Sequence, residues 1–187
     1  MRPQKSTLKA KPISDPRKYQ RRALAQILRL RRTMRRHNRQ DAPKSFLDGA
    51  FQLCLLKKDI SENLNQFPHE VLVLEAQRQL SGRPKYENLE WYWHPRQTSG
   101  SFETDLMGWR GEQLVVVAEA NTSASPVGTI RDRIVKAVSN LAGVEHPADR
   151  FFFCFTESCA ACARKVTSAM YPNTSIEMVV LTSEIPA

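Results

Sequence analysis

Hydrophobic and polar residues recur along the chain with two different periods, and these periods predict where helices and strands lie. Leu24, Ile27, Leu28 and Met34 recur at helical spacing in a segment that is otherwise rich in arginine. This spacing predicts an amphipathic helix with a narrow apolar stripe. We expect the stripe to dock on a core while the guanidinium groups point outward.

The start of this helix has a sequence signature. Ser14 or Asp15 can cap the helix, and Pro16 suits its first position. Residues 1–13 are polar, basic and interrupted by prolines, so we expect them to be disordered when unbound.

Two further helical segments are predicted over residues 41–61 and 67–82. Gly82 and Pro84 close the second of them. The aromatic run at 88–95 is typical of a short strand, in which aromatic side chains usually serve core and edge packing.

The rest of the chain alternates between strand and helix patterns. An apolar, β-branched run follows a turn at residues 110–112 and predicts a hairpin. The elements predicted in order are a hairpin over 105–121, a helix over 126–143, a strand over 149–155, a helix over 157–172 and a strand over 176–184. This order predicts an α/β fold with a mixed β-sheet flanked by helices.

The positive charge of the chain is concentrated at one end. Residues 1–40 hold 14 of the 28 Lys and Arg residues and a single acid, whereas residues 41–187 hold 14 basic and 18 acidic residues. We therefore expect two parts, a basic arm over 1–40 and a single α/β domain over 41–187. Clustered Lys and Arg favour a polyanionic partner.

Several classes of protein are not favoured by the sequence. No apolar run approaches the roughly 20 residues that span a bilayer, and no secretory signal is present, so we expect a cytoplasmic protein without membrane contact. No glycine-rich loop of the Walker or dinucleotide type appears, which argues against an ATPase or a nicotinamide enzyme.

Two acids and an amide stand out beside the predicted hairpin. In a strand over 113–121, Val115, Val117, Glu119 and Asn121 share one face. The paired strand can bring Asp105 close to Glu119. Half-buried carboxylates repel each other unless they are protonated or bound to a cation, and Mg²⁺ prefers such oxygen ligands.

These residues resemble the motif of the PD-(D/E)XK, or restriction-endonuclease-like, nuclease superfamily. The motif is an acid at the start of a hairpin followed by an apolar strand that ends in acid-x-Lys; here it is Asp105 and then VVVAEAN, with Thr104 in place of the motif proline and Asn121 in place of the lysine. The resemblance covers roughly residues 70–185 and implies a restriction-endonuclease-like core.

The resemblance also implies an activity and a site. The implied activity is that of a Mg²⁺-dependent endodeoxyribonuclease, with Mn²⁺ as an alternative ion. Asp105, Glu119 and Asn121 would be catalytic, and the ion would be held by Asp105, Glu119, the carbonyl of Ala120 and an acid from the preceding helix. Glu70 is the preferred acid and Glu75 is the alternative. Glu103 lies on the same predicted strand face as Asp105 and is either a further ligand or a bystander. Some members take the motif lysine from the next helix, where this chain offers Arg131, Arg133 and Lys136.

The expected partner is DNA, and a homodimer is expected because a small nuclease with one site needs two copies to cut both strands. One alternative is a catalytically inactive nuclease-fold protein that binds DNA or serves assembly; a second is a basic RNA-associated protein. The residues expected to contact nucleic acid are Arg21, Arg22, Arg29, Arg31, Arg32, Arg35, Arg36, Arg131 and Lys136.

The four cysteines are candidate ligands of a metal ion or cluster. Cys154, Cys159 and Cys162 have C-x4-C-x2-C spacing, with Cys54 upstream, and iron-sulfur nucleases of the superfamily also place four cysteines around their core. Cys154 nevertheless lies in an apolar strand pattern, and the other two lie in an alanine-rich helix where cysteine packs well. An iron-sulfur cluster or a zinc site is therefore not favoured, and we expect reduced thiols.

Overall fold

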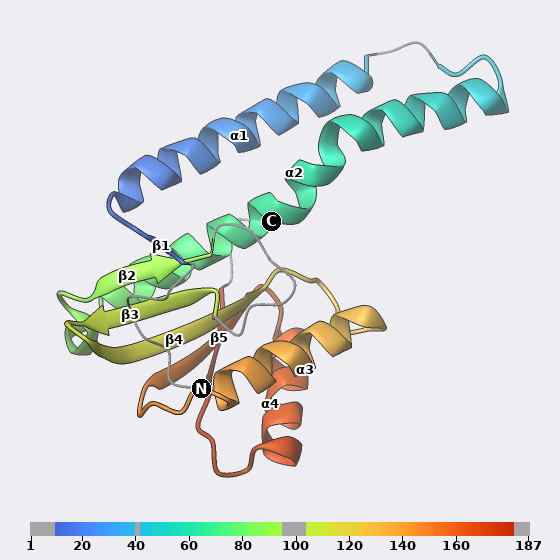
Figure 1. Cartoon of the computed structure of the whole chain (residues 1–187). Helices are drawn as coiled ribbons and strands as arrows, with labels where there is room; N and C mark the ends of the chain where they lie inside the picture. Colours follow the sequence, from blue (N-terminus) through green and yellow to red (C-terminus); the bar gives the residue numbers. More distant parts are fainter. Residues whose placement is uncertain (1–9, 40–41, 95–103, 182–187) are drawn as a thin grey trace. The chain divides into compact units, whose positions relative to one another are not determined.

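The computed structural model describes residues 10–39, 42–94 and 104–181 (Figure 1). The chain divides into two compact units. The helical unit is Asp15–Val71, and the sheet unit comprises Met1–Ser14 and Leu72–Ala187. The residues predicted as a basic arm, 1–40, are thus shared between the two units. Within the described residues, no helix combines the length and the apolar character needed to cross a membrane.

The helical unit consists of α1 (Pro16–His37) and the first part of α2 (Phe46–Ser81). Asp15 caps α1, as the sequence predicted, because its Oδ1 accepts a hydrogen bond from the Lys18 backbone N–H at 3.0 Å. Near the other end of α1, His37 Nε2 lies 3.0 Å from Asp59 Oδ2 of α2.

The prediction that the apolar stripe of α1 docks on a core is wrong. Leu24, Ile27, Leu28 and Met34 are all exposed, by 38–57%. The buried side is instead centred on Ala23, and Leu30 seven residues later is half-buried.

The segment predicted as two helices, 41–61 and 67–82, is one helix. α2 runs from Phe46 to Ser81, and its backbone remains helical at Pro68. Proline cannot donate the backbone hydrogen bond of a helix interior, which makes a break there the usual expectation. Gly82 follows the last residue of α2 as predicted, and its N–H bonds to the Arg78 carbonyl at 3.2 Å.

The sheet unit contains a six-stranded mixed sheet flanked by helices, which confirms the α/β class. The strands lie in sequence order, antiparallel from β1 to β4 and parallel from β4 to β6. The strands are β1 (Lys11–Pro12), β2 (Glu90–Trp93), β3 (Leu106–Arg110), β4 (Gln113–Asn121), β5 (Asp149–Cys154) and β6 (Glu177–Val180). The intervening helices are η2 (Pro84–Tyr86), α3 (Thr129–Ala142) and α4 (Glu157–Met170).

One prediction for the N-terminal segment is wrong within the described residues. Lys11 and Pro12 form β1, which pairs with β2, and the Ile13 N–H bonds to the Trp91 carbonyl at 2.8 Å. Residues 10–13 are therefore ordered against the sheet edge. The rest of the segment predicted to be disordered, residues 1–9, lies outside the described residues.

The predicted alternation of β4 fails at one position. A bulge opposite Gly108 and Trp109 interrupts the register, so that Leu114 and Val117 both enter the same hydrophobic cluster. From Val116 onward the pairing is regular, and Glu119 and Asn121 share a face as predicted.

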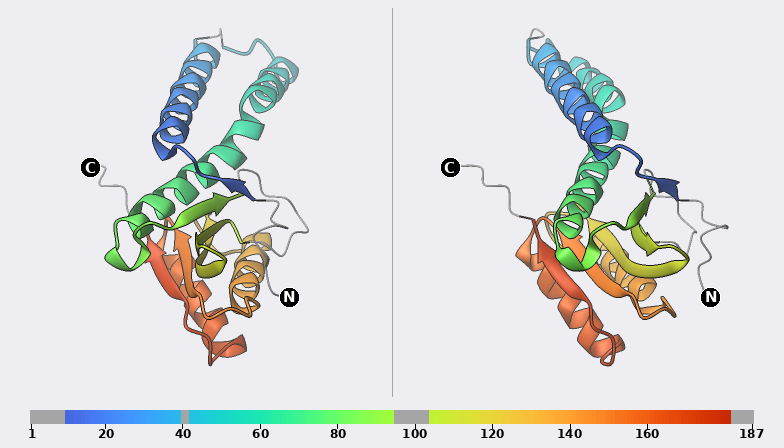
Figure 2. Two further views of the ribbon diagram at one scale, coloured as in Figure 1. Left: turned by 60° about the vertical axis from the view of Figure 1, so that its left-hand side comes forward. Right: turned by 90° about the vertical axis from the view of Figure 1, so that its left-hand side faces the viewer.

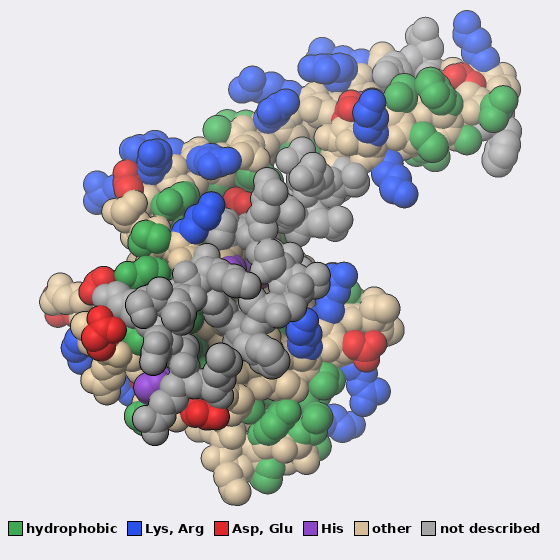
Figure 3. All heavy atoms as spheres, viewed as in Figure 1, with side chains coloured by type: hydrophobic (Ala, Val, Ile, Leu, Met, Phe, Trp, Pro, Cys, Tyr) green, Lys and Arg blue, Asp and Glu red, His purple; other side chains and the backbone are tan. Residues whose placement is uncertain are grey.

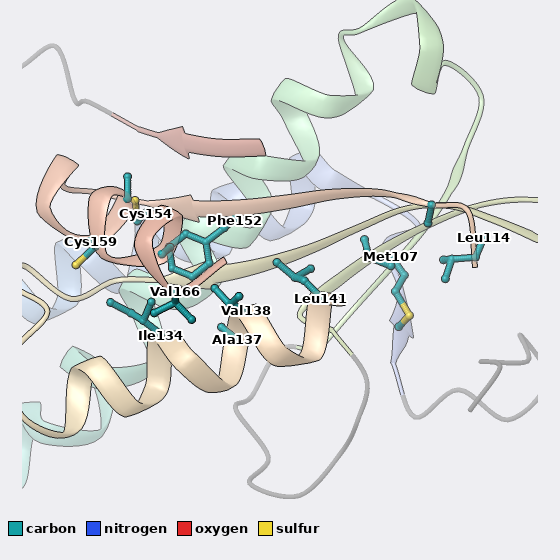
Figure 4. Close-up of a cluster of buried hydrophobic side chains, with 14 of the residues drawn as sticks. Met107, Leu114, Ile134, Ala137, Val138, Leu141, Phe152, Cys154, Cys159 and Val166 are labelled. Atoms are coloured by element: carbon teal, nitrogen blue, oxygen red, sulfur yellow. The ribbon is translucent and has the colours of Figure 1, made fainter. Parts of the chain in front are cut away.

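Two helices cover one face of the sheet. α3 and α4 pack together there (Figures 1 and 2), and their apolar side chains interlock with those of β4 and β5 (Figure 4). Ile134, Val138 and Phe152 are fully buried in this cluster. Burying such side chains contributes about 1.5–3 kcal/mol each, so this cluster fixes α3 against the end of β4.

The segment that follows α2 contributes contacts on the opposite face, where the side chain of Phe151 lies. Tyr86 packs edge-on against Phe151 with ring centroids 5.9 Å apart, and its hydroxyl donates to Asp149 Oδ2 at 2.8 Å. Arg83 forms a two-pronged ion pair with Glu177 of β6. At the end of β4, by contrast, the buried side chains include the polar residues Glu119 and Asn121.

Candidate active site

The two acids of the motif meet at the end of the sheet because of strand register. Leu106 pairs with Trp93 on one side and with Ala118 on the other. The residues one step beyond these, His94, Asp105 and Glu119, therefore lie on three adjacent strands at one level. The His94 N–H donates to the Asp105 carbonyl at 3.0 Å, which extends the pairing past the last residue of β3.

The side chain of Asp105 is fixed by the backbone of β4. Its Oδ2 accepts a hydrogen bond from the Ala120 N–H at 2.9 Å. Asp105 is half-buried, and Thr104 before it is buried with its hydroxyl donating to the Leu106 carbonyl at 3.2 Å. Thr104, which replaces the motif proline, thus holds the chain in place as it enters β3.

Glu119 lies near the end of β4, and its carboxyl group is buried, with 7% of the residue exposed. Burial raises its pKa well above the usual range, and the negative charge of Asp105 raises the pKa further. A hydrogen bond from Asn140 Nδ2 to Glu119 Oε1, 3.0 Å long, acts in the opposite direction. The two acids therefore form a close pair that resists carrying two negative charges.

A positively charged side chain of α3 also lowers the pKa of Glu119. The charge of Lys136 lowers the pKa of Glu119, so its ammonium group lies within electrostatic range of the carboxyl. Lys136 and Asn140 are four residues apart and share one face of the helix. Arg131 is exposed and lies about 140° around the helix from Lys136, so the two residues are on different faces of α3.

Asn140 was not among the residues that the sequence singled out. Its only signal is its position one helical turn after Lys136, in the helix that follows the acid-bearing strand. The side-chain contact with Glu119 depends on how α3 packs on the sheet, which the spacing alone does not give.

Asn121, which stands where the motif has lysine, is 8% exposed. Its Oδ1 accepts a hydrogen bond from the Ser123 N–H at 3.0 Å and so stabilises the turn that leaves β4. The amide of Asn121 thus has a local structural role next to Glu119.

The other predicted ligands come from several parts of the chain. The carboxylate of Glu75 accepts hydrogen bonds from Arg78, at 2.8 and 2.5 Å, and from Gln79. Glu70 belongs to the helical unit, and Glu103 lies outside the described residues. The Ala120 N–H donates to Asp105, and the Ala120 carbonyl stays a predicted ligand. Among the described residues, no three His, Cys, Asp or Glu side chains gather closely enough to hold a metal ion.

The residues at the end of β4 nevertheless fit a hard divalent cation. Mg²⁺ is commonly held by one or two carboxylates and keeps several waters, so it does not require a cage of protein ligands. A cation beside Asp105 and Glu119 would offset the repulsion that raises the pKa of Glu119. The chemistry of this donor pair therefore suits Mg²⁺ or Mn²⁺.

The cysteines act as thiol donors in the sheet unit. Burial raises the pKa of Cys154 to about 11, and its Sγ donates to the Thr156 carbonyl at 3.4 Å. Cys159 Sγ donates to the Ser123 carbonyl at 3.3 Å, next to the candidate site. Cys162 is half-buried, and Cys54 lies exposed in the helical unit. These contacts suit protonated thiols.

The arginines of α1 cover much of the surface of that helix. α1 carries nine Lys and Arg residues and no acid, and Lys and Arg side chains follow the helix in Figure 3. Its exposed arginines include Arg21, Arg22, Arg29, Arg31, Arg32, Arg35 and Arg36.

Comparison of the chain with protein-family models, with curated proteins and with solved structures finds no match.

Proposed function

We propose that this protein is a metal-dependent DNA endonuclease with a restriction-endonuclease-like core, in which Asp105 and Glu119 hold Mg²⁺. The observation that supports this most directly is the Asp105–Glu119 pair, in which Glu119 has a raised pKa at the end of a strand. Perturbed acids of this kind concentrate at functional sites. The residues Asp105, Glu119 and Lys136 also offer the charges that phosphodiester hydrolysis requires.

Each side chain has a distinct task in this proposal. Bound Mg²⁺ would polarise the scissile phosphate and lower the pKa of an attacking water. Asn140 orients the Glu119 carboxylate by holding Oε1, and the Ala120 N–H orients Asp105. Lys136 supplies the positive charge that the motif lysine provides in the superfamily, and it stabilises the negative charge that develops on the phosphate.

Asn121 therefore has a positioning task. The Asn121–Ser123 hydrogen bond fixes the turn after β4 and so the direction of Glu119 and Ala120. The arginine-rich α1 would hold the DNA backbone, and a homodimer would present one such site to each strand.

The experiment that tests this function is a cleavage assay on supercoiled plasmid and on short duplex, junction and single-stranded DNAs, with Mg²⁺, Mn²⁺ or EDTA. We expect metal-dependent cleavage by the wild-type chain and its loss in Asp105→Asn and Glu119→Gln. Glu112→Gln, in the exposed hairpin turn, is the matched control for loss of a carboxylate. Cleavage that persists in both site variants would overturn the proposal.

A second function, a catalytically inactive DNA-binding or assembly protein, is favoured by one observation. Asn121 Oδ1 is used by a local turn, and an amide brings no charge to the site. This function predicts binding of DNA without cleavage in any of the three metal conditions, unchanged by Asp105→Asn and Glu119→Gln.

A further inference from the structure

The helical unit contains a cleft of about 330 Å³ between α1 and α2. Arginines from α1 line most of it, and one acid comes from α2. The lining residues are Gln26, Arg29, Leu30, Arg32, Thr33, Arg36 and Asp59.

The three arginines of the cleft form a row. Arg29, Arg32 and Arg36 are three and four residues apart, so they lie on one side of α1. Seven residues of helix rise by about 10.5 Å, and the row therefore extends over about three phosphate steps of one DNA strand, at about 3.4 Å of duplex axis each. Within the described part of the chain, none of the three guanidinium groups forms an ion pair.

The acid in the cleft is engaged by another side chain. Asp59 Oδ2 lies 3.0 Å from His37 Nε2, and this contact ties α2 to the end of α1. The three guanidinium groups thus outnumber a single carboxylate, and Gln26 and Thr33 add hydrogen-bonding groups. Guanidinium groups bind phosphate oxygens in a two-pronged geometry, which suits backbone recognition.

We propose that this cleft is the DNA-backbone site of the protein, and that Arg29, Arg32 and Arg36 contact phosphates within this span of one strand while Arg31 and Arg35 do not. The proposal rests on the proposed function only for the choice of DNA as the polyanion. Arg31 and Arg35 lie about 100–140° around the helix from the row, so they point away from the cleft. The proposal thus limits DNA contact to one face of the basic helix α1.

The test compares two pairs of substitutions that remove the same charge from the same helix. Arg29→Gln with Arg32→Gln removes two cleft arginines, and Arg31→Gln with Arg35→Gln removes two from the other side. Binding of the full chain to a labelled duplex is measured by fluorescence anisotropy in EDTA over a series of salt concentrations. Far-UV circular dichroism checks that both variants keep their helices.

We expect the cleft pair to reduce the slope of log K against log salt by about 2, because about 0.9 is lost for each phosphate contact. The other pair should reduce the slope by less than half as much. Equal losses in the two pairs would overturn the proposal. Tighter binding of an RNA of the same length, lost in the cleft pair, would overturn the choice of DNA.

A gain-of-binding variant gives a second test. Asp59→Asn removes the one acidic group among the described residues that line the cleft, and it retains an oxygen that can accept from His37. We expect tighter duplex binding; weaker binding would contradict the site. Because all these measurements are made without metal, they succeed or fail independently of cleavage.

Discussion

Asn140 Nδ2 donates a hydrogen bond to Glu119 Oε1 across 3.0 Å, and this bond joins α3 to the end of β4. The hydrophobic contacts of Ile134 and Val138 also hold α3 on the sheet. Glu119 is buried, so its carboxylate depends on such partners to carry a charge.

Asn140→Ala removes the donor that lowers the pKa of Glu119. We expect the pKa of Glu119 to rise further, so that the acidic limb of the pH–cleavage profile moves to higher pH and Mg²⁺ binds more weakly. The profile is measured by initial rates between pH 5 and 9. Asn173→Ala, exposed in the turn after α4, is the control and should leave the profile in place.

Glu119→Gln should stabilise the protein in EDTA at neutral pH. The folded state holds the Glu119 proton more tightly than the unfolded chain does, because the folded pKa is raised. The stability associated with this proton is complete below the pKa of an unfolded glutamate, about 4.3, and is lost as pH rises through the raised pKa. The Glu119→Gln variant does not lose stability in this way, because glutamine has no proton that titrates.

The measurement is the melting temperature of both proteins against pH. In a chain of this size, about 1 kcal/mol of stability corresponds to about 2–4 °C. We expect the wild-type melting temperature to decline relative to that of Glu119→Gln as pH increases. Parallel curves at all pH values would show that Glu119 titrates normally.

Mg²⁺ should raise the melting temperature of the wild-type chain, since an ion that binds only the folded state stabilises it by about 2.7 kcal/mol at a hundred times Kd. The increase should disappear in Asp105→Asn and in Glu119→Gln, and it should shrink as pH falls, because the ion competes with the Glu119 proton. An increase of the same size in either variant would place the ion elsewhere.

Lys136→Gln removes a positive charge that lowers the pKa of Glu119 and that, in the proposed function, stabilises the phosphate. We expect cleavage to slow by about 10²-fold while duplex binding in EDTA changes little. Lys165→Gln, exposed on α4, removes the same charge away from the site and should cleave at the wild-type rate. A parallel loss of binding and cleavage in Lys136→Gln would assign the residue to substrate binding.

Gly108→Ala tests the packing that supports the site. An added Cβ would lie 2.6 Å from Val116 Cγ1 and 2.9 Å from Leu89 Cδ1, and overpacking of this kind costs about 1–3 kcal/mol. The free energy of unfolding is measured by urea titration. Gly82→Ala, whose Cβ would meet its neighbours at an ordinary 3.6 Å, should cost clearly less.

Much of the sheet unit could be predicted from local patterns. The hairpin with its turn after Arg110, the buried strand that contains Phe152, and the helices α3 and α4 lie where the hydrophobic periods place them. These elements are long or strongly patterned, and their periods match their burial. The pairing of Asp105 with Glu119 also followed from a short turn and an alternating strand.

Other features could not be found in this way. The bulge at Val115 changes which residues of β4 share a face. It could not be predicted, because an extra residue in one strand leaves no signal in the local sequence pattern. The continuous helix at Pro68 and the exposed stripe of α1 run against the propensities of their residues, since burial is decided by the partner surface.

Local sequence patterns account for the order of strands and helices from β2 to β6, for the concentration of basic residues before residue 40, and for the two acids beside one hairpin. They do not show that Asn140 and Lys136 influence Glu119, or that Arg29, Arg32 and Arg36 line one cleft. Local periodicity sets only the direction in which a side chain leaves its own element. Contacts between elements depend on packing over long sequence separations, as in the 21 residues between Glu119 and Asn140.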